Sequence, residues 1–157
     1  MNLELYFQKE IMMEDISVFI LDDDLYFGRC MQRNLQNVCR EVRYFKTKRN
    51  FLKAIDSNPE VIILDHHIDS DIGLHVLDEI NRRGLETYVL YVSSQDNVHV
   101  TLEAYQKGAV GYFEKNKSTF SQVVKAINWM GTTTHNFNYP LDKEHFKKNN
   151  SWVLKER

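Results

Sequence analysis

Apolar residues in this chain gather in short, unbroken runs that stop at polar or charged residues. These runs are rich in β-branched and aromatic residues and do not alternate with polar ones, which is typical of strands buried on both faces of a parallel sheet. A fifth segment, Glu41–Phe45, alternates polar and apolar residues, and we expect it to form an edge strand. The four apolar runs are Ile16–Leu21, Val61–Leu64, Tyr88–Val92 and Ala109–Phe113.

Segments of helical length separate these strands. Their apolar residues recur at three- and four-residue intervals, as in Met31, Leu35 and Val38. Gly84 is a stop signal, and Ser118 is a candidate N-cap. Regular alternation of strands and helices predicts a doubly wound α/β domain with a five-stranded parallel sheet and helices on both faces. The predicted helices span Leu25–Val38, Lys48–Asp56, Leu74–Ile80, Asn97–Lys107 and Ser118–Met130.

The composition fits an ordinary globular protein with one domain. The 157 residues are 43% hydrophobic and 27% charged, and the net charge of −2 gives no sign of wholesale nucleic-acid binding. No apolar run approaches the roughly 18 residues of a membrane helix, and the N-terminus lacks the pattern of a signal peptide. Cys30 and Cys39 lack metal-ligand spacing, so we expect two reduced thiols in a cytoplasmic protein.

We expect the folded domain to span residues 15–131. Residues 1–14 form an N-terminal arm in which ELYFQ resembles a tag-removal protease site. The arm is therefore either partly derived from an expression tag or a native amphipathic segment. Residues 132–157 form a polar, slightly basic C-terminal extension with at most one short helix near residues 141–148, and Trp152 is a candidate to dock on the core.

Side chains that could take part in a reaction follow the predicted strands at their carboxyl ends. Asp22 follows the first strand, Asp65 the third, Ser93 the fourth and Lys115 the fifth. These ends meet at one edge of a parallel sheet, where α/β proteins place their sites. Carboxylates crowded together repel one another unless a cation is present, and Mg²⁺ prefers such oxygen ligands. With a nearby hydroxyl and ammonium, the set suits phosphoryl transfer to a carboxylate nucleophile.

Four motifs carry a family resemblance. VFILDDD, VIILDHHIDSDIG, VLYVSS and GAVGYFEKN resemble, in order and spacing, the signatures of the response-regulator receiver domain of two-component signalling, across Ile16 to Gly131. Gly73 stands eight residues after Asp65, where the family has its glycine, and Tyr112 stands three residues before Lys115. The resemblance implies a flavodoxin-like sheet with strand order 2-1-3-4-5.

The resemblance also implies an acceptor and a metal site. Asp65 would be the phosphoacceptor, and Asp22 and Asp23 would hold Mg²⁺ together with Asp65 and the backbone carbonyl of His67. The phosphoryl group would come from a sensor histidine kinase or a histidine phosphotransfer protein. Output would pass to an unidentified protein partner, with no direct nucleic-acid contact and no membrane insertion.

Three further roles follow from the same motifs. Ser93 would donate a hydrogen bond to a phosphoryl oxygen. Lys115 would pair with the phosphoryl group when it is present and with Asp65 when it is absent. Tyr112 would be the aromatic switch whose rotamer follows Ser93. Such a protein is no enzyme beyond its own phosphorylation from a phosphodonor and its slow dephosphorylation.

The chain departs from the family pattern in the loops around this site. Asp69 and Asn116 replace prolines that the family usually has, and we expect the Lys115–Asn116 peptide bond to be trans. His66 and His67 are adjacent and point apart, so solvated loop histidines are the expected reading rather than a shared metal site. Asp24 is expected to be a solvated or helix-capping residue and not a ligand, and Asp69 and Asp71 to be loop and cap residues.

Two other functions compete with a phosphorylated receiver. A pseudo-receiver would bind partners without phosphorylation, and the polar loop keeps that reading open. ILDDDLY also resembles the first motif of haloacid-dehalogenase-type phosphatases, with Asp22 as nucleophile and Asp24 as acid/base. That reading leaves Asp65 and the spacing to Gly73 unexplained, and Tyr26 stands where the motif has Thr or Val.

Overall fold

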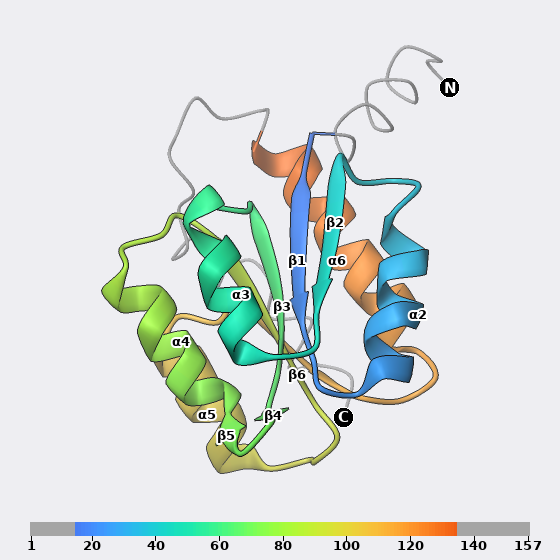
Figure 1. The fold of residues 1–157 in the computed structure, drawn as a ribbon. Coiled ribbons are helices and arrows are strands. Elements are labelled where there is room, and N and C mark those ends of the chain that lie inside the picture. The colour runs from blue at the N-terminus through green and yellow to red at the C-terminus, as the bar shows by residue number, and fades with distance from the viewer. Residues whose placement is uncertain (1–14, 135–157) are drawn as a thin grey trace, which may run out of the picture.

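A five-stranded parallel sheet forms the centre of the molecule (Figure 1). The computed structural model describes residues 15–134 of the 157-residue chain. The strand order is β2-β1-β3-β6-β7, with every neighbouring pair parallel, which confirms the predicted order of the five strands. The strands are β1 (Ser17–Leu21), β2 (Glu41–Phe45), β3 (Val61–Asp65), β6 (Tyr88–Ser93) and β7 (Gly111–Glu114).

Helices cover both faces of the sheet, as predicted. Figure 1 shows α2 and α6 on one face and α3, α4 and α5 on the other. Two separate apolar clusters match this division: one contains Met31 and Ile127, and the other contains Phe51 and Leu77. The helices are α2 (Leu25–Leu35), α3 (Lys48–Ala54), α4 (Gly73–Arg82), α5 (Val98–Gln106) and α6 (Thr119–Thr134), and a short 3₁₀ helix, Ile55–Ser57, follows α3.

Burial along the strands confirms the reading of the apolar runs. Every residue of β1, β3 and β6 is buried, because helices pack on both faces of these strands. Alternate residues of β1 enter opposite clusters, Val18 and Ile20 on the α2–α6 side and Phe19 and Leu21 on the other. β2 alternates between exposed and partly buried residues up to Phe45, which fits its place at the sheet edge.

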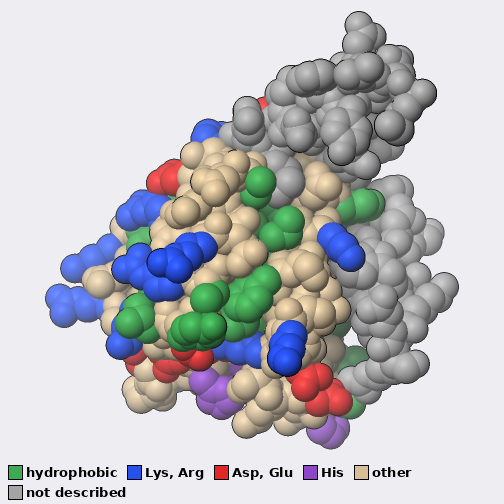
Figure 2. All heavy atoms as spheres, turned by 90° about the vertical axis from the view of Figure 1, so that its right-hand side faces the viewer, with side chains coloured by type: hydrophobic (Ala, Val, Ile, Leu, Met, Phe, Trp, Pro, Cys, Tyr) green, Lys and Arg blue, Asp and Glu red, His purple; other side chains and the backbone are tan. Residues whose placement is uncertain are grey.

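The edge strand β2 lies in a strongly basic part of the chain. From Arg29 to Lys53 the sequence has eight Lys or Arg residues and one acidic residue, Glu41, so the net charge of −2 conceals this asymmetry. Figure 2 shows Lys and Arg side chains gathered along one margin of the side that α2 presents. Charges beside an edge strand oppose pairing with a strand of another chain.

Element boundaries differ from the expected ones in a few places. α2 ends at Leu35 rather than Val38, and α6 continues to Thr134, past the expected domain end at residue 131. Ser118 precedes α6, but its hydroxyl donates to Asn116 Oδ1 at 2.6 Å instead of capping the helix. No cis peptide bond occurs among residues 15–134, so the Lys115–Asn116 bond is trans, as expected. The expected arm, the extension beyond residue 134 and Trp152 lie outside the described residues.

One small element of the structure was not predicted from the sequence. β4 (His67–Ile68) and β5 (Asp71–Ile72) form a two-stranded antiparallel hairpin between β3 and α4. Strands of two residues are too short to show a hydrophobic period, and the polar residues around them are typical of a loop. Within the described part of the chain, no helix is long and apolar enough to cross a membrane.

Candidate functional site

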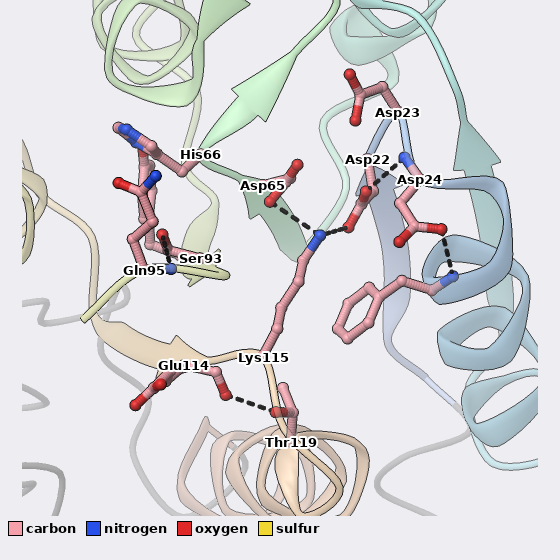
Figure 3. A network of polar contacts seen from close by, with 12 residues as sticks. Asp22, Asp23, Asp24, Asp65, His66, Ser93, Gln95, Glu114, Lys115 and Thr119 are labelled. Atoms are coloured by element: carbon pink, nitrogen blue, oxygen red, sulfur yellow. Dashed lines mark hydrogen bonds and ion pairs between the residues drawn. The ribbon is translucent and has the colours of Figure 1, made fainter. Parts of the chain in front are cut away.

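Lys115 joins two carboxylates that are far apart in the sequence. Its Nζ lies 2.7 Å from Asp22 Oδ2 and 3.0 Å from Asp65 Oδ1 (Figure 3). Asp22 directly follows β1, Asp65 ends β3 and Lys115 directly follows β7, so the parallel sheet brings all three to one edge. The lysine Nζ also lies 4.4 Å from the centre of the Phe27 ring of α2, a cation–π contact that helps to hold it. The expected convergence of these residues is therefore found.

Burial makes the electrostatics of this site unusual. Asp22 is only 2% exposed and Asp65 only 4%. Burial, together with the nearby Asp65, raises the pKa of Asp22 to about 7, although Lys115 opposes the shift. Burial likewise raises the pKa of Asp65 against the effect of Lys115. Burial alone would lower the pKa of Lys115, but Asp22 and Asp65 together raise it. One ammonium thus faces two buried carboxyl groups, and the site favours further positive charge.

A third carboxylate completes a set of oxygen ligands. One oxygen from each of Asp22, Asp23 and Asp65 lies within 4.8 Å of the other two. Asp22 is oriented by the backbone N–H of Asp24, which donates to its Oδ1 at 2.9 Å. Hard oxygen ligands in this number suit Mg²⁺, which accepts a few carboxylates and fills its other positions with water or phosphate oxygens. The residues present therefore fit the expected metal.

Ser93 and Tyr112 each form a hydrogen bond with the backbone of the same loop residue, Gln95. Ser93 is fully buried at the end of β6, and its Oγ accepts the backbone N–H of Gln95 at 3.1 Å. The Tyr112 hydroxyl donates to the carbonyl oxygen of the same Gln95 at 3.1 Å. The Tyr112 ring also stacks on Tyr91, with 5.8 Å between ring centres. A movement of the Ser93 hydroxyl would thus disturb the loop that holds Tyr112.

The expectation that His66 is a solvated loop residue is wrong. Its side chain is buried, 7% exposed, and its Nδ1 lies 2.7 Å from the Tyr91 hydroxyl. The cause is that pairing with β6 continues past β3: the His66 N–H donates to the Val92 carbonyl at 2.9 Å. Strand alternation then directs His66 to the side of Leu64 and Tyr91, under α4. Burial and the neighbouring His67 lower the pKa of His66, whereas His67 itself is exposed, as expected.

The other acidic residues near the site have structural roles. The Asp24 carboxylate caps α2 by accepting the N–H groups of Tyr26 and Phe27, as expected. Asp71 pairs with Lys48 at 2.5 Å and with His75 at 2.6 Å, and these two hydrogen bonds lower its pKa. Asp24 thus caps α2 and is not one of the three carboxylates that cluster at the site.

Gly73 stands eight residues after Asp65 for a steric reason. A Cβ atom at Gly73 would lie 2.2 Å from the backbone oxygen of Asp65 and 2.8 Å from the Tyr91 hydroxyl. The N–H of Gly73 also donates to the carbonyl oxygen of His66 at 2.7 Å. The first residue of α4 therefore packs directly against the segment that carries Asp65, and only glycine leaves room for this approach.

A family model described as the response regulator receiver domain matches residues 18–128, most of the described chain. The chain belongs to this family. This receiver is 33% identical over 119 residues to the probable transcriptional regulatory protein NarL of Mycobacterium tuberculosis, covering 73% of this chain and 54% of that protein. It is 24% identical over 100 residues to the transcriptional regulatory protein TdiR of Thauera aromatica, covering 63% and 44%. The receiver thus spans about half the length of these curated relatives.

Solved structures agree with the family. The signal receiver domain of the putative response regulator NarL from Mycobacterium tuberculosis has a TM-score of 0.66 and 26% identity, covering 76% of this receiver and 98% of that chain. A CheY-like receiver domain protein from Methanospirillum hungatei has a TM-score of 0.70 at 15% identity, covering 78% and 98%. The second likeness shows the fold alone, which is the expected flavodoxin-like one.

Proposed function

We propose that this receiver is a phosphoacceptor module of a two-component or phosphorelay system, with Asp65 as the residue phosphorylated. An oxygen of the Asp65 carboxylate attacks phosphorus of a phosphohistidine, the P–N bond breaks, and the imidazole leaves with its electron pair. The product is an aspartyl phosphate, whose later hydrolysis returns the carboxylate and inorganic phosphate. Asp22, Asp23, Asp65 and the His67 carbonyl would hold Mg²⁺, which neutralises charge on the phosphoryl oxygens when bound.

The position of Lys115 between Asp22 and Asp65 carries this proposal. A lysine only 14% exposed, held by the two carboxylates, stands where a phosphoryl group on Asp65 needs a cation. Ser93 also supports the proposal. It is fully buried and ends β6, the strand that pairs with β3. Phosphoryl transfer depends mainly on positioning and charge neutralisation, and these residues would supply both.

The test is intact mass after incubation with acetyl phosphate and Mg²⁺. We expect one added phosphoryl group in the wild type and none in Asp65→Asn. Asp56→Asn is the matched control, since Asp56 has an exposed carboxylate on the 3₁₀ helix after α3 and should leave the adduct unchanged. Chelation of Mg²⁺ should abolish the adduct. Phosphorylation that persists in Asp65→Asn would refute the assignment of the acceptor.

A pseudo-receiver is the second candidate, favoured by Asp69 and Asn116 in place of the usual prolines. Such a protein would form no adduct with acetyl phosphate or with any histidine kinase. Mg²⁺ titration then separates the two, because a phosphorylated receiver needs the cation and a pseudo-receiver does not.

The expected setting follows from the family. The phosphoryl donor would be a sensor histidine kinase or a histidine phosphotransfer protein, and output would pass to a protein partner. Direct nucleic-acid contact and membrane insertion are not part of the proposal, and the protein would act in the cytoplasm. The receiver would include all of α6, which continues to Thr134.

A further inference from the structure

We propose that the backbone N–H of Asp69 is a positioning group for the Asp23 carboxylate, a role that the family's usual proline could not fill. The inference rests on the proposed function, because Asp23 is one of the residues expected to hold Mg²⁺. Asp69 itself would not touch the metal. It would act by fixing the orientation of Asp23 before the cation arrives.

The contact links two loops at the edge of the sheet. The Asp69 N–H donates to Asp23 Oδ2 at 3.1 Å, across 46 positions of the sequence. Among the described residues, the Asp23 carboxylate accepts this one hydrogen bond. A hydrogen bond to an ionised carboxylate is stronger than one between neutral groups, and it leaves the second oxygen free for another ligand.

The backbone at Asp69 makes this contact possible. Asp69 lies between β4 and β5 with φ of 54°, in the left-handed region that most non-glycine residues avoid and that Asp tolerates. Proline has φ fixed near −65° and carries no N–H. A chain with proline at this position would therefore lack both the turn and the donor, so the departure from the family pattern creates the contact.

A second set of contacts keeps the turn in place. Asp69 Oδ2 accepts the backbone N–H of Lys48 at 3.3 Å, at the start of α3. The Lys48 ammonium pairs with Asp71 Oδ2 at 2.5 Å, and both side chains are less than one-third exposed. The hairpin is thus tied to α3 on one side and to Asp23 on the other. The left-handed residue costs free energy, and these ties offset it.

Such a restraint matters because Asp23 belongs to a cluster of like charges. Its carboxylate has an oxygen within 4.8 Å of oxygens of both Asp22 and Asp65. Repulsion would turn a free Asp23 side chain toward solvent, and cation binding would then have to order it again. Ordering a ligand in advance removes that cost from binding. The Asp69 N–H should therefore strengthen Mg²⁺ binding.

The experiment compares three substitutions by calorimetric titration with Mg²⁺. Asp69→Pro removes the N–H and the turn, Asp69→Gly keeps both but lacks the carboxylate, and Asp69→Asn keeps the N–H, the turn and an oxygen acceptor. We expect the dissociation constant to rise about tenfold for Asp69→Pro and to stay within about twofold for the other two. Wild-type affinity in Asp69→Pro, or an equal loss in all three variants, would overturn the proposal.

A measurement without metal keeps the test independent of the metal site and of how well the proline variant folds. In the wild type with chelator, the Asp69 amide should be protected from hydrogen exchange, and Asp23→Ala should remove that protection. Unchanged exchange in Asp23→Ala would refute the contact. If the wild type binds no Mg²⁺, the proposed function loses its metal site, whereas the exchange result still decides whether Asp69 positions Asp23.

Discussion

The imidazole of His66 and the phenol of Tyr91 form a buried polar pair, with 2.7 Å between Nδ1 and the hydroxyl oxygen. His66 directly follows Asp65, and the Tyr91 ring stacks on Tyr112. The pair therefore connects the segment that carries the proposed phosphoacceptor to the proposed aromatic switch. The contact satisfies His66 Nδ1, which would otherwise be buried without this partner, whereas the Tyr91 hydroxyl also has a hydrogen bond from the backbone of Leu74.

Removing both members of this pair should cost less than the sum of the two single removals. Tyr91→Phe leaves His66 Nδ1 without its partner, and we expect a loss of about 1–3 kcal/mol in the free energy of unfolding. His66→Phe removes one partner of the Tyr91 hydroxyl, which keeps its hydrogen bond from the Leu74 backbone, so this single loss should be the smaller one. The double variant removes both polar groups, so its loss should fall short of the sum of the two single losses by at least about 0.5 kcal/mol. Urea unfolding of the four proteins measures this coupling.

The control for that cycle is Tyr112→Phe. Its hydroxyl donates to the Gln95 carbonyl at 3.1 Å at an exposed position, so water can replace the lost partner. We expect Tyr112→Phe to cost less than Tyr91→Phe and to be additive with His66→Phe. Strict additivity of His66→Phe with Tyr91→Phe would show that the buried contact contributes no coupling.

Much of the site could be predicted from the sequence because parallel strands place their carboxyl ends at one edge. Asp22, Asp65, Ser93 and Lys115 each stand at or just after the end of an apolar run, and the structure places them together. Unbroken apolar runs predicted the buried strands. These predictions needed only local patterns and one rule of topology.

The parts that could not be predicted depend on contacts between distant segments. His66 is buried because its N–H continues the pairing of β3 with β6. The residue types that follow Asp65 do not predict this continued pairing. The one available signal was Tyr91, a polar aromatic residue inside an apolar strand, which needs a hydrogen-bond partner when buried. Similarly, the contact of Asp69 with Asp23 depends on a left-handed turn that no pattern in the loop indicates.

Gly73 should tolerate no side chain. In Gly73→Ala the new Cβ would meet the backbone oxygen of Asp65 at 2.2 Å, and backbone cannot move aside as a flexible side chain can. We expect a loss of about 3 kcal/mol or more in the free energy of unfolding, at the upper end of overpacking effects. Gly84→Asn is the control, because its Cβ would have open space and Asn tolerates φ of 64°. Equal small losses in both variants, measured by urea unfolding, would contradict the close approach of α4.

The two cysteines should differ in reactivity. Burial raises the pKa of the Cys39 thiol to about 11, whereas Cys30 is partly exposed. At pH 8 we expect iodoacetamide to alkylate Cys30 alone, with the rate at Cys39 rising about tenfold per pH unit toward pH 11 because only the thiolate reacts. Cys30→Ser isolates the Cys39 reaction, and peptide mapping after 8 M urea should show both sites modified. Equal labelling of the native protein at pH 8 would show that Cys39 is accessible.

Asp22→Asn should raise the stability of the metal-free protein and weaken its stabilisation by Mg²⁺. Without metal, Asp22 is a buried carboxyl group close to Asp65, with one ammonium between them, so the neutral amide should raise the free energy of unfolding by about 1–3 kcal/mol at pH 8. With free Mg²⁺ at about ten times its dissociation constant, the wild type should gain about 1.4 kcal/mol. Asp22→Asn should gain much less, because it has lost a carboxylate ligand.

Asp56→Asn serves as the matched control for this comparison. Asp56 is exposed and pairs with Arg83 on the surface, so the substitution should change neither the metal-free stability by more than about 0.5 kcal/mol nor the response to Mg²⁺. Urea unfolding of the three proteins with chelator and with Mg²⁺ gives the six values needed. An Asp22→Asn variant that is less stable than the wild type with chelator would mean that the Asp22–Lys115 pair outweighs the burial of the charge. The crowding of carboxylates would then not be what prepares this site for a cation.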